Sequence, residues 1–163
     1  VYNFLDILSH ARTETDIIRE LTEDEASFRS LTRSWFEHSD LLTLLRLLSE
    51  RGHTVIITSD HGTIRIDNPV KVTGDRETSA NLRYKTGRNL AYNSREVYEI
   101  TLYSSAASDV YKRQSYIFAY NTDFLVYNND ANRYIRYYRN TYQHGGISME
   151  EMLVPYIVLK PKQ

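Results

Sequence analysis

The chain contains no cysteine, so it can form neither disulfides nor thiolate metal sites. That absence suits a cytoplasmic protein, because cytoplasmic chains rarely depend on disulfides. No apolar run approaches the roughly 20 residues that a membrane-spanning helix needs, and no membrane partner is expected. The first residues also lack the basic start and the long apolar core of a signal peptide.

A large excess of charge of either sign is missing as well. Twenty basic and twenty-one acidic residues leave a formal charge of -1, so no global field attracts the chain to nucleic acid or to a membrane surface. The 163 residues, 41% of them hydrophobic, are typical of one globular domain or a large piece of one. Because the chain starts at Val1 with what reads as mid-strand sequence, we expect a domain truncated at its N-terminus.

A strand is predicted over 54–59, where a β-branched, largely apolar run leads to Asp60, His61 and Gly62. This pattern is typical of a buried parallel strand that delivers polar side chains to the carboxyl edge of a sheet. A helical pattern precedes the run, so helix–loop–strand is the local unit. The sequence therefore predicts an α/β fold with a mostly parallel sheet flanked by helices.

Helical periodicity covers residues 13–38, where Thr22 and Glu25 are expected to form a capping box at a break. A second helix is predicted over 39–51, capped by Ser39 or Asp40. Strands are predicted over 96–102 and 115–119, followed by a tyrosine-rich helix over about 130–141. A capping box of Ser148 with Glu151 and a closing strand over 154–159 are expected near the C-terminus.

The polar segment 74–95 contains several basic residues, among them Arg83 and Lys85. Guanidinium and ammonium groups in a long irregular segment can grip phosphate, so we expect these two side chains to contact substrate. The alternative is a solvated loop with ordinary basic residues.

Residues 104–114 do not resemble evolved protein. The stretch 109–114 resembles the translation of a transposon-adapter sequence used in library preparation. We therefore expect 104–114 to be a sequencing-adapter or assembly scar, and we exclude it from the fold and the site.

Five residues are candidate metal ligands. Asp6 and His10 are four residues apart and share one face of a helix, although Asp6 could instead cap that helix and His10 be merely polar. Asp60 and His61 follow the apolar strand, and His144 precedes two glycines that allow a sharp turn. Oxygen and imidazole donors without sulfur suit zinc, with manganese or iron as alternatives. If every one of these residues merely capped or faced solvent, three separate motifs would coincide by chance.

The order and spacing of these motifs resemble the alkaline phosphatase superfamily. More narrowly, residues 58–63, 81–87 and 143–152 resemble the PglZ domain, nearest to that of PorX-type response regulators associated with type IX secretion. The resemblance covers nearly the whole chain apart from 104–114. It implies an alkaline-phosphatase-like fold, of which 1–163 would be the C-terminal portion.

The resemblance also implies two zinc ions. One zinc would be held by Asp6, His10 and His144, and the other by Asp60 and His61 with an upstream aspartate and a Thr or Ser nucleophile. Neither of these last two groups has a counterpart in the chain, and both are expected upstream of Val1.

The function implied is that of a zinc-dependent phosphodiesterase or phosphatase, the output domain of a two-component response regulator. It would act on oligonucleotides or cyclic oligonucleotides and be inactive as this fragment, which lacks the nucleophile. Implied partners are a sensor kinase, a sigma factor and a second copy of the chain. The alternative is a non-catalytic, zinc-stabilised signalling or scaffold module.

The gene sequence upstream of Val1 tests this interpretation. We expect it to encode an aspartate at a strand end and a Thr or Ser at the position of the nucleophile. Their absence would favour the scaffold alternative.

Overall fold

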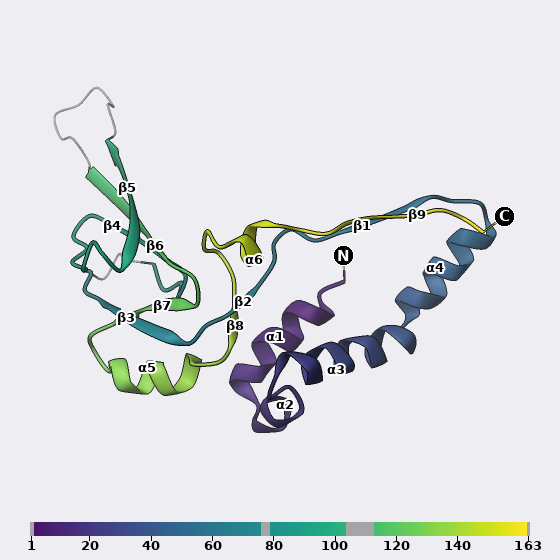
Figure 1. Ribbon diagram of the computed structural model, residues 1–163, viewed down its shortest axis with the longest axis horizontal. Coiled ribbons are helices and arrows are strands. Elements are labelled where there is room, and N and C mark those ends of the chain that lie inside the picture. The colour runs from purple at the N-terminus through teal and green to yellow at the C-terminus, as the bar shows by residue number, and fades with distance from the viewer. Residues whose placement is uncertain (1, 76–78, 104–112, 163) are drawn as a thin grey trace. The chain divides into compact units, whose positions relative to one another are not determined.

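A computed structural model describes residues 2–75, 79–103 and 113–162, and their side chains except those of 10–14, 103, 113 and 114. The chain forms two compact units. The helical unit comprises residues 1–60 and 154–163, and the β unit comprises residues 61–153. Figure 1 labels the elements of both units.

The helical unit begins with four helices, which are α1 (Phe4–Glu14), α2 (Asp16–Leu21), α3 (Glu25–Glu37) and α4 (Asp40–Glu50). The predicted break near residue 22 is present, but the capping box of Thr22 with Glu25 is wrong. Asp24 caps α3 instead, because its carboxylate accepts a hydrogen bond from the Ser27 amide at 2.7 Å. Ser39 caps α4 as predicted, by accepting from the Leu42 amide.

These helices bury little of their apolar surface. Each helix contacts the next along the chain, and the rings of Phe4 and Trp35 stack 4.3 Å apart between α1 and α3. No side chain of α2, α3 or α4 is fully buried. The stability of these helices therefore depends on local capping and on neighbouring turns more than on a shared core.

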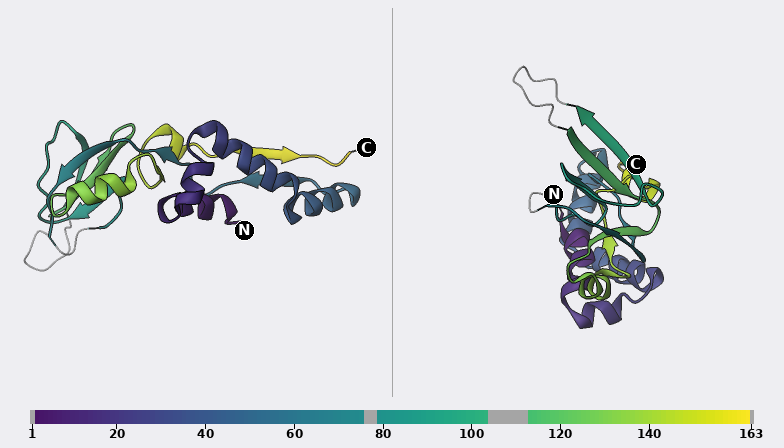
Figure 2. Two further views of the ribbon diagram at one scale, coloured as in Figure 1. Left: turned by 90° about the horizontal axis from the view of Figure 1, so that it is seen from below. Right: turned by 90° about the vertical axis from the view of Figure 1, so that its left-hand side faces the viewer.

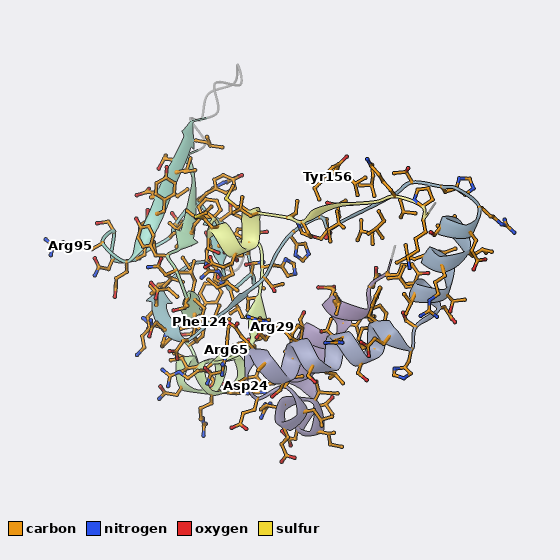
Figure 3. The ribbon with its side chains drawn as sticks, turned by 45° about the vertical axis from the view of Figure 1, so that its right-hand side comes forward. Asp24, Arg29, Arg65, Arg95, Phe124 and Tyr156 are labelled. Carbon is orange, nitrogen blue, oxygen red and sulfur yellow. The ribbon has the colours of Figure 1, made fainter. Side chains whose placement is uncertain are left out.

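The apolar strand β1 (Val55–Thr58) pairs antiparallel with β9 (Tyr156–Leu159), which confirms the closing strand. The expectation of a buried parallel strand is wrong. Ile56 is 54% exposed, all four residues of β9 are exposed, and the Tyr156 side chain projects from this two-stranded ribbon (Figure 3). An apolar run indicates a strand but carries no information about the direction or the partner of its pairing.

The described residues of the β unit form three sheets. Antiparallel pairs form between β2 (Ile64–Arg65) and β8 (Tyr142–Gln143), and within the sheet β4–β6–β5 (Tyr84–Gly87, Arg113–Ala119, Val97–Tyr103). The one parallel pair of the described strands joins β3 (Asn68–Val72) to β7 (Asp123–Tyr127). The fold is thus mixed α/β, and the predicted mostly parallel sheet is replaced by small, mostly antiparallel sheets. Consecutive strands β5 and β6 can pair side by side without the long crossover that parallel pairing requires.

Two apolar clusters hold the β unit together. The first contains Val72, Ile117 and Leu125, and the second contains Ile66, Phe124 and Val126. Neighbouring residues of β7 alternate between the two clusters because successive side chains of a strand point to opposite faces. Figure 3 shows Phe124 inside the β unit.

Two helices complete the β unit. The tyrosine-rich helix α5 (Ala131–Tyr138) contacts β7, as Figures 1 and 2 show. The short helix α6 (Met149–Met152) begins at the predicted capping box of Ser148 with Glu151. None of the helices in the described residues has both the length and the apolar character that a membrane crossing requires.

Most of the adapter-like segment, residues 104–112, lies outside the described residues. Its last two residues are described, and Arg113 and Gln114 pair with Tyr103 and Leu102 at the start of β6. The origin of the segment stays a prediction.

The packing of β7 can be tested by two matched leucine truncations in the β unit. Leu125 is fully buried, whereas Leu102 on β5 is 55% exposed. We expect Leu125→Ala to lower the free energy of unfolding by about 2–5 kcal/mol, because it leaves a cavity in the first cluster. Leu102→Ala should lower it by less than about 1 kcal/mol. Urea unfolding curves measure both, and equal losses would contradict this account of the core.

Candidate metal centre

His61 and His144 are brought together by the pairing of β2 with β8. In this antiparallel pair Ile64 lies opposite Gln143, so the start of β2 and the end of β8 are at the same end of the ladder. His61 precedes β2 and His144 directly follows β8. Two imidazoles that are distant in the sequence therefore meet beside this pair.

The two rings stack with their centroids 3.8 Å apart and their planes at 13°. Both side chains are half-buried. A ring nitrogen of His61 lies within 4.8 Å of a ring nitrogen of His144, so the two residues can donate to one ion or to two neighbouring ions.

The tautomer of His61 is set by the main chain. Its Nδ1 lies 3.0 Å from the Gly62 carbonyl oxygen, which can only accept a hydrogen bond. Nδ1 therefore carries the proton, and the lone pair of the neutral ring is on Nε2. Metal-binding histidines commonly have their second nitrogen oriented in this way, so the donors present fit zinc.

The turn after His144 is as sharp as its two glycines indicate. Gly145 has φ +97°, a backbone conformation that L side chains rarely adopt. Gly146 then donates its amide to the Glu151 carboxylate at 2.9 Å. This turn fixes where the chain leaves β8 and hence where the His144 ring lies.

The remaining predicted ligands belong to the helical unit. Asp6 is in the first turn of α1, and Asp60 follows β1 immediately before His61. His10 is in α1, but its side chain lies outside the described side chains. The structure thus brings His61 and His144 together, and the ligand roles of all five residues, Asp6, His10, Asp60, His61 and His144, stay predictions.

Arg83 and Lys85 point into the β unit and are 0% and 1% exposed. The Arg83 guanidinium forms a bidentate ion pair with Glu151, with Nε to Oε1 and the second terminal nitrogen to Oε2 both at 2.9 Å. The Lys85 ammonium lies 4.4 Å from the centre of the Tyr127 ring. The substrate contact expected of both side chains stays a prediction, and their burial gives each of them a second, internal role.

Glu151 is the residue near this centre whose importance the sequence did not reveal. Burial alone would raise the pKa of its carboxyl, but hydrogen bonds from Arg83 and Ser148 and the charge of Arg83 outweigh burial and hold the pKa below its usual value. Glu151 is part of the capping box and of the 143–152 motif, but neither signal indicated its contacts at this centre. Its pairing with Arg83 has no sequence signature, since 68 residues separate the two.

The family of the chain follows from a match over almost its entire length. The model of the BREX system PglZ alkaline phosphatase-like domain matches residues 1–159. The chain belongs to the PglZ family. No curated protein matches it.

Membership in this family confirms the PglZ resemblance. PglZ domains are alkaline phosphatase-like, and domains of that kind are typically metal-dependent phosphatases or phosphodiesterases. The half-buried imidazoles of His61 and His144 are the nitrogen donors that the described residues bring together in this domain.

The burial of Lys85 in the PglZ domain predicts a pH dependence of stability. Burial lowers the pKa of Lys85 from 10.5 to about 8. Between these values the unfolded chain binds more protons than the folded one, so stability should rise as pH increases from about 8 to 10. Lys85→Met should remove a rise on the order of 2 kcal/mol, measured by urea unfolding across this range. The exposed Lys71→Met is the control, and an unchanged rise in Lys85→Met would contradict the prediction.

Proposed function

We propose that this PglZ domain binds zinc through His61 and His144 and forms the metal-binding part of a phosphodiesterase. The observation that carries the proposal is the ring stack at 3.8 Å, with the His61 tautomer fixed by the Gly62 carbonyl. Membership in the PglZ family, by a match over residues 1–159, supports a metal-dependent domain.

The proposed ligand set follows the order of the superfamily motifs. His144 acts with Asp6 and His10 on one ion, and His61 acts with Asp60 on the other. The carboxylates of Asp6 and Asp60 add the negative charge that makes a divalent cation more favourable than two imidazoles alone would.

The chemistry proposed is the displacement of an alcohol from a phosphodiester. The zinc ions, when bound, supply Lewis-acid stabilisation of phosphoryl oxygens. The chain's own part is to hold the imidazole donors oriented. The attacking Thr or Ser belongs, by the family pattern, to a segment N-terminal to Val1. Thr58, Ser59 and Thr63 do not replace it, because the nucleophile belongs to a different strand end.

The substrate and the setting are proposed from the resemblance to PorX-type proteins. Oligonucleotides, including cyclic ones, fit a phosphodiesterase of this kind, and a response regulator would be controlled by a sensor kinase. A sigma factor and a second copy of the chain are the other partners proposed.

A second candidate is a zinc-stabilised scaffold without catalysis. It is favoured by the apolar side chains that the β1–β9 ribbon leaves exposed, among them Ile56, Tyr156 and Ile157. Exposed apolar surface of this kind is typical of partner docking.

Metal binding is tested first on the 163-residue chain by titration with Zn²⁺ and with Co²⁺, whose visible absorption reports nitrogen ligands. We expect His61→Ala and His144→Ala each to weaken binding at least about tenfold, because each removes a donor. His53→Ala, at an exposed histidine, is the matched control and should bind like wild type. Wild-type affinity in both site variants would overturn the proposal.

Catalysis is tested separately on the parent protein with its upstream segment. We expect it to take up zinc and to cleave bis-p-nitrophenyl phosphate, and His144→Ala should abolish turnover. A parent protein that binds zinc through these residues but never turns over would contradict the phosphodiesterase and favour the scaffold.

A further inference from the structure

Glu151 contacts both segments that carry the stacked histidines. Its main-chain carbonyl accepts a hydrogen bond from the Gly62 amide at 2.8 Å, directly after His61. Its carboxylate accepts from the Gly146 amide at 2.9 Å, two residues after His144. One residue of α6 therefore fixes the backbone beside each imidazole.

The approach of α6 to these segments leaves no room for a side chain. A Cβ atom at Gly62 would overlap the carbonyl oxygen of Glu150. A Cβ atom at Gly146 would lie 2.6 Å from Oε2 of Glu151 and 3.0 Å from Nε of Arg83. Both glycines are thus needed because α6 packs directly on the backbone at these two positions.

The Glu151 carboxylate is itself held in place from the sheet side. Arg83 grips both of its oxygens, and the side chains of the pair are 0% and 1% exposed. The Arg83 guanidinium also donates to the main-chain carbonyl of Asp123, at the start of β7. The Arg83 amide donates to the Asn81 side chain at 2.7 Å. A continuous series of hydrogen bonds therefore runs from β7 through Arg83 and Glu151 to the turn after His144.

Stability alone does not account for this arrangement. Removing two charges from water is costly, and apolar residues of similar volume often replace a buried ion pair without loss of stability. What apolar residues cannot replace is the acceptor that Glu151 provides to the Gly146 amide and to the amide and hydroxyl of Ser148. The pair is suited to fix the direction of a backbone turn.

We propose that Arg83 and Glu151 are positioning residues that hold His61 and His144 in the stacked arrangement for metal binding. The inference rests on the proposed metal-binding function. It assigns to two residues outside the ligand set a role in orienting that set, which is the part that outer partners of metal ligands take in other sites.

The test separates positioning from stability with a double variant, Arg83→Met with Glu151→Met. It leaves no buried charge unpaired, so we expect the protein to remain folded, with a melting temperature lowered by the loss of the acceptor for the Gly146 amide and for Ser148. The contacts between the ring protons of His61 and His144, seen by NMR in the metal-free protein, should be lost. Co²⁺ affinity should fall about 10- to 100-fold.

Two further variants make the outcome decisive. Arg33→Met with Glu37→Met removes an exposed ion pair of α3 and should change neither readout. Gly146→Ala keeps both charges but displaces the Glu151 carboxylate, so it should weaken both ring contacts and Co²⁺ affinity; it decides the question if the double variant does not fold.

The inference is overturned if the double variant, or Gly146→Ala in its place, keeps wild-type ring contacts and Co²⁺ affinity. Because the NMR readout needs no metal, it tests positioning even if wild type binds no Co²⁺. In that case only the proposed metal-binding function would fail.

Discussion

Each oxygen of a buried carboxylate needs hydrogen-bond donors or an opposite charge beside it. This requirement determines which segments of the β unit meet at Glu151. Arg83 supplies the opposite charge from the strand side, and the amides of Gly146 and Ser148 supply donors from the turn. Each of these partners is thereby fixed relative to the others. A short helix of four residues has little stability of its own, and α6 owes its place to these bonds.

The candidate centre depends on the same constraint. The pairing of β2 with β8 covers only two residues on each strand, which is too little to fix two side chains beyond its end. The bond from Gly62 to the Glu151 carbonyl and the bond from Gly146 to the Glu151 carboxylate extend the connection past the ladder. In the proposed positioning role, Glu151 therefore acts on the histidine pair from outside the proposed ligand set.

Local signals in the sequence predicted several of the elements and caps but not the pairing of the strands. The Ser39 cap, the capping box of Ser148 with Glu151 and the strand 55–58 all depend on neighbouring residues, and they were predicted correctly. The parallel sheet was wrong because β1 meets β9, a partner from the other end of the chain, in the antiparallel direction. Periodicity indicates which face of a strand is apolar, but it gives no information on which segment covers that face.

The candidate site shows the same difference between local signals and long-range pairing. His61 and His144 were predicted from short local motifs, in each of which a histidine is followed by glycine. In the structure the backbone after each histidine passes close to another segment. The partner of Arg83 could not be predicted, since a charge on a strand gives no indication of a carboxylate 68 residues away.

Arg83 and Lys85 show why a basic motif alone does not define a phosphate site. Both are on or next to β4, both are almost completely buried, and the structure accommodates their charges in different ways. Arg83 keeps its charge because a planar fork can satisfy both oxygens of one carboxylate. Lys85 has the face of Tyr127 beside it, and burial brings its pKa down to about 8. A guanidinium resists such a loss of its proton, so an arginine keeps its charge beside the Glu151 carboxylate at alkaline pH, where a lysine with a pKa of about 8 would lose it.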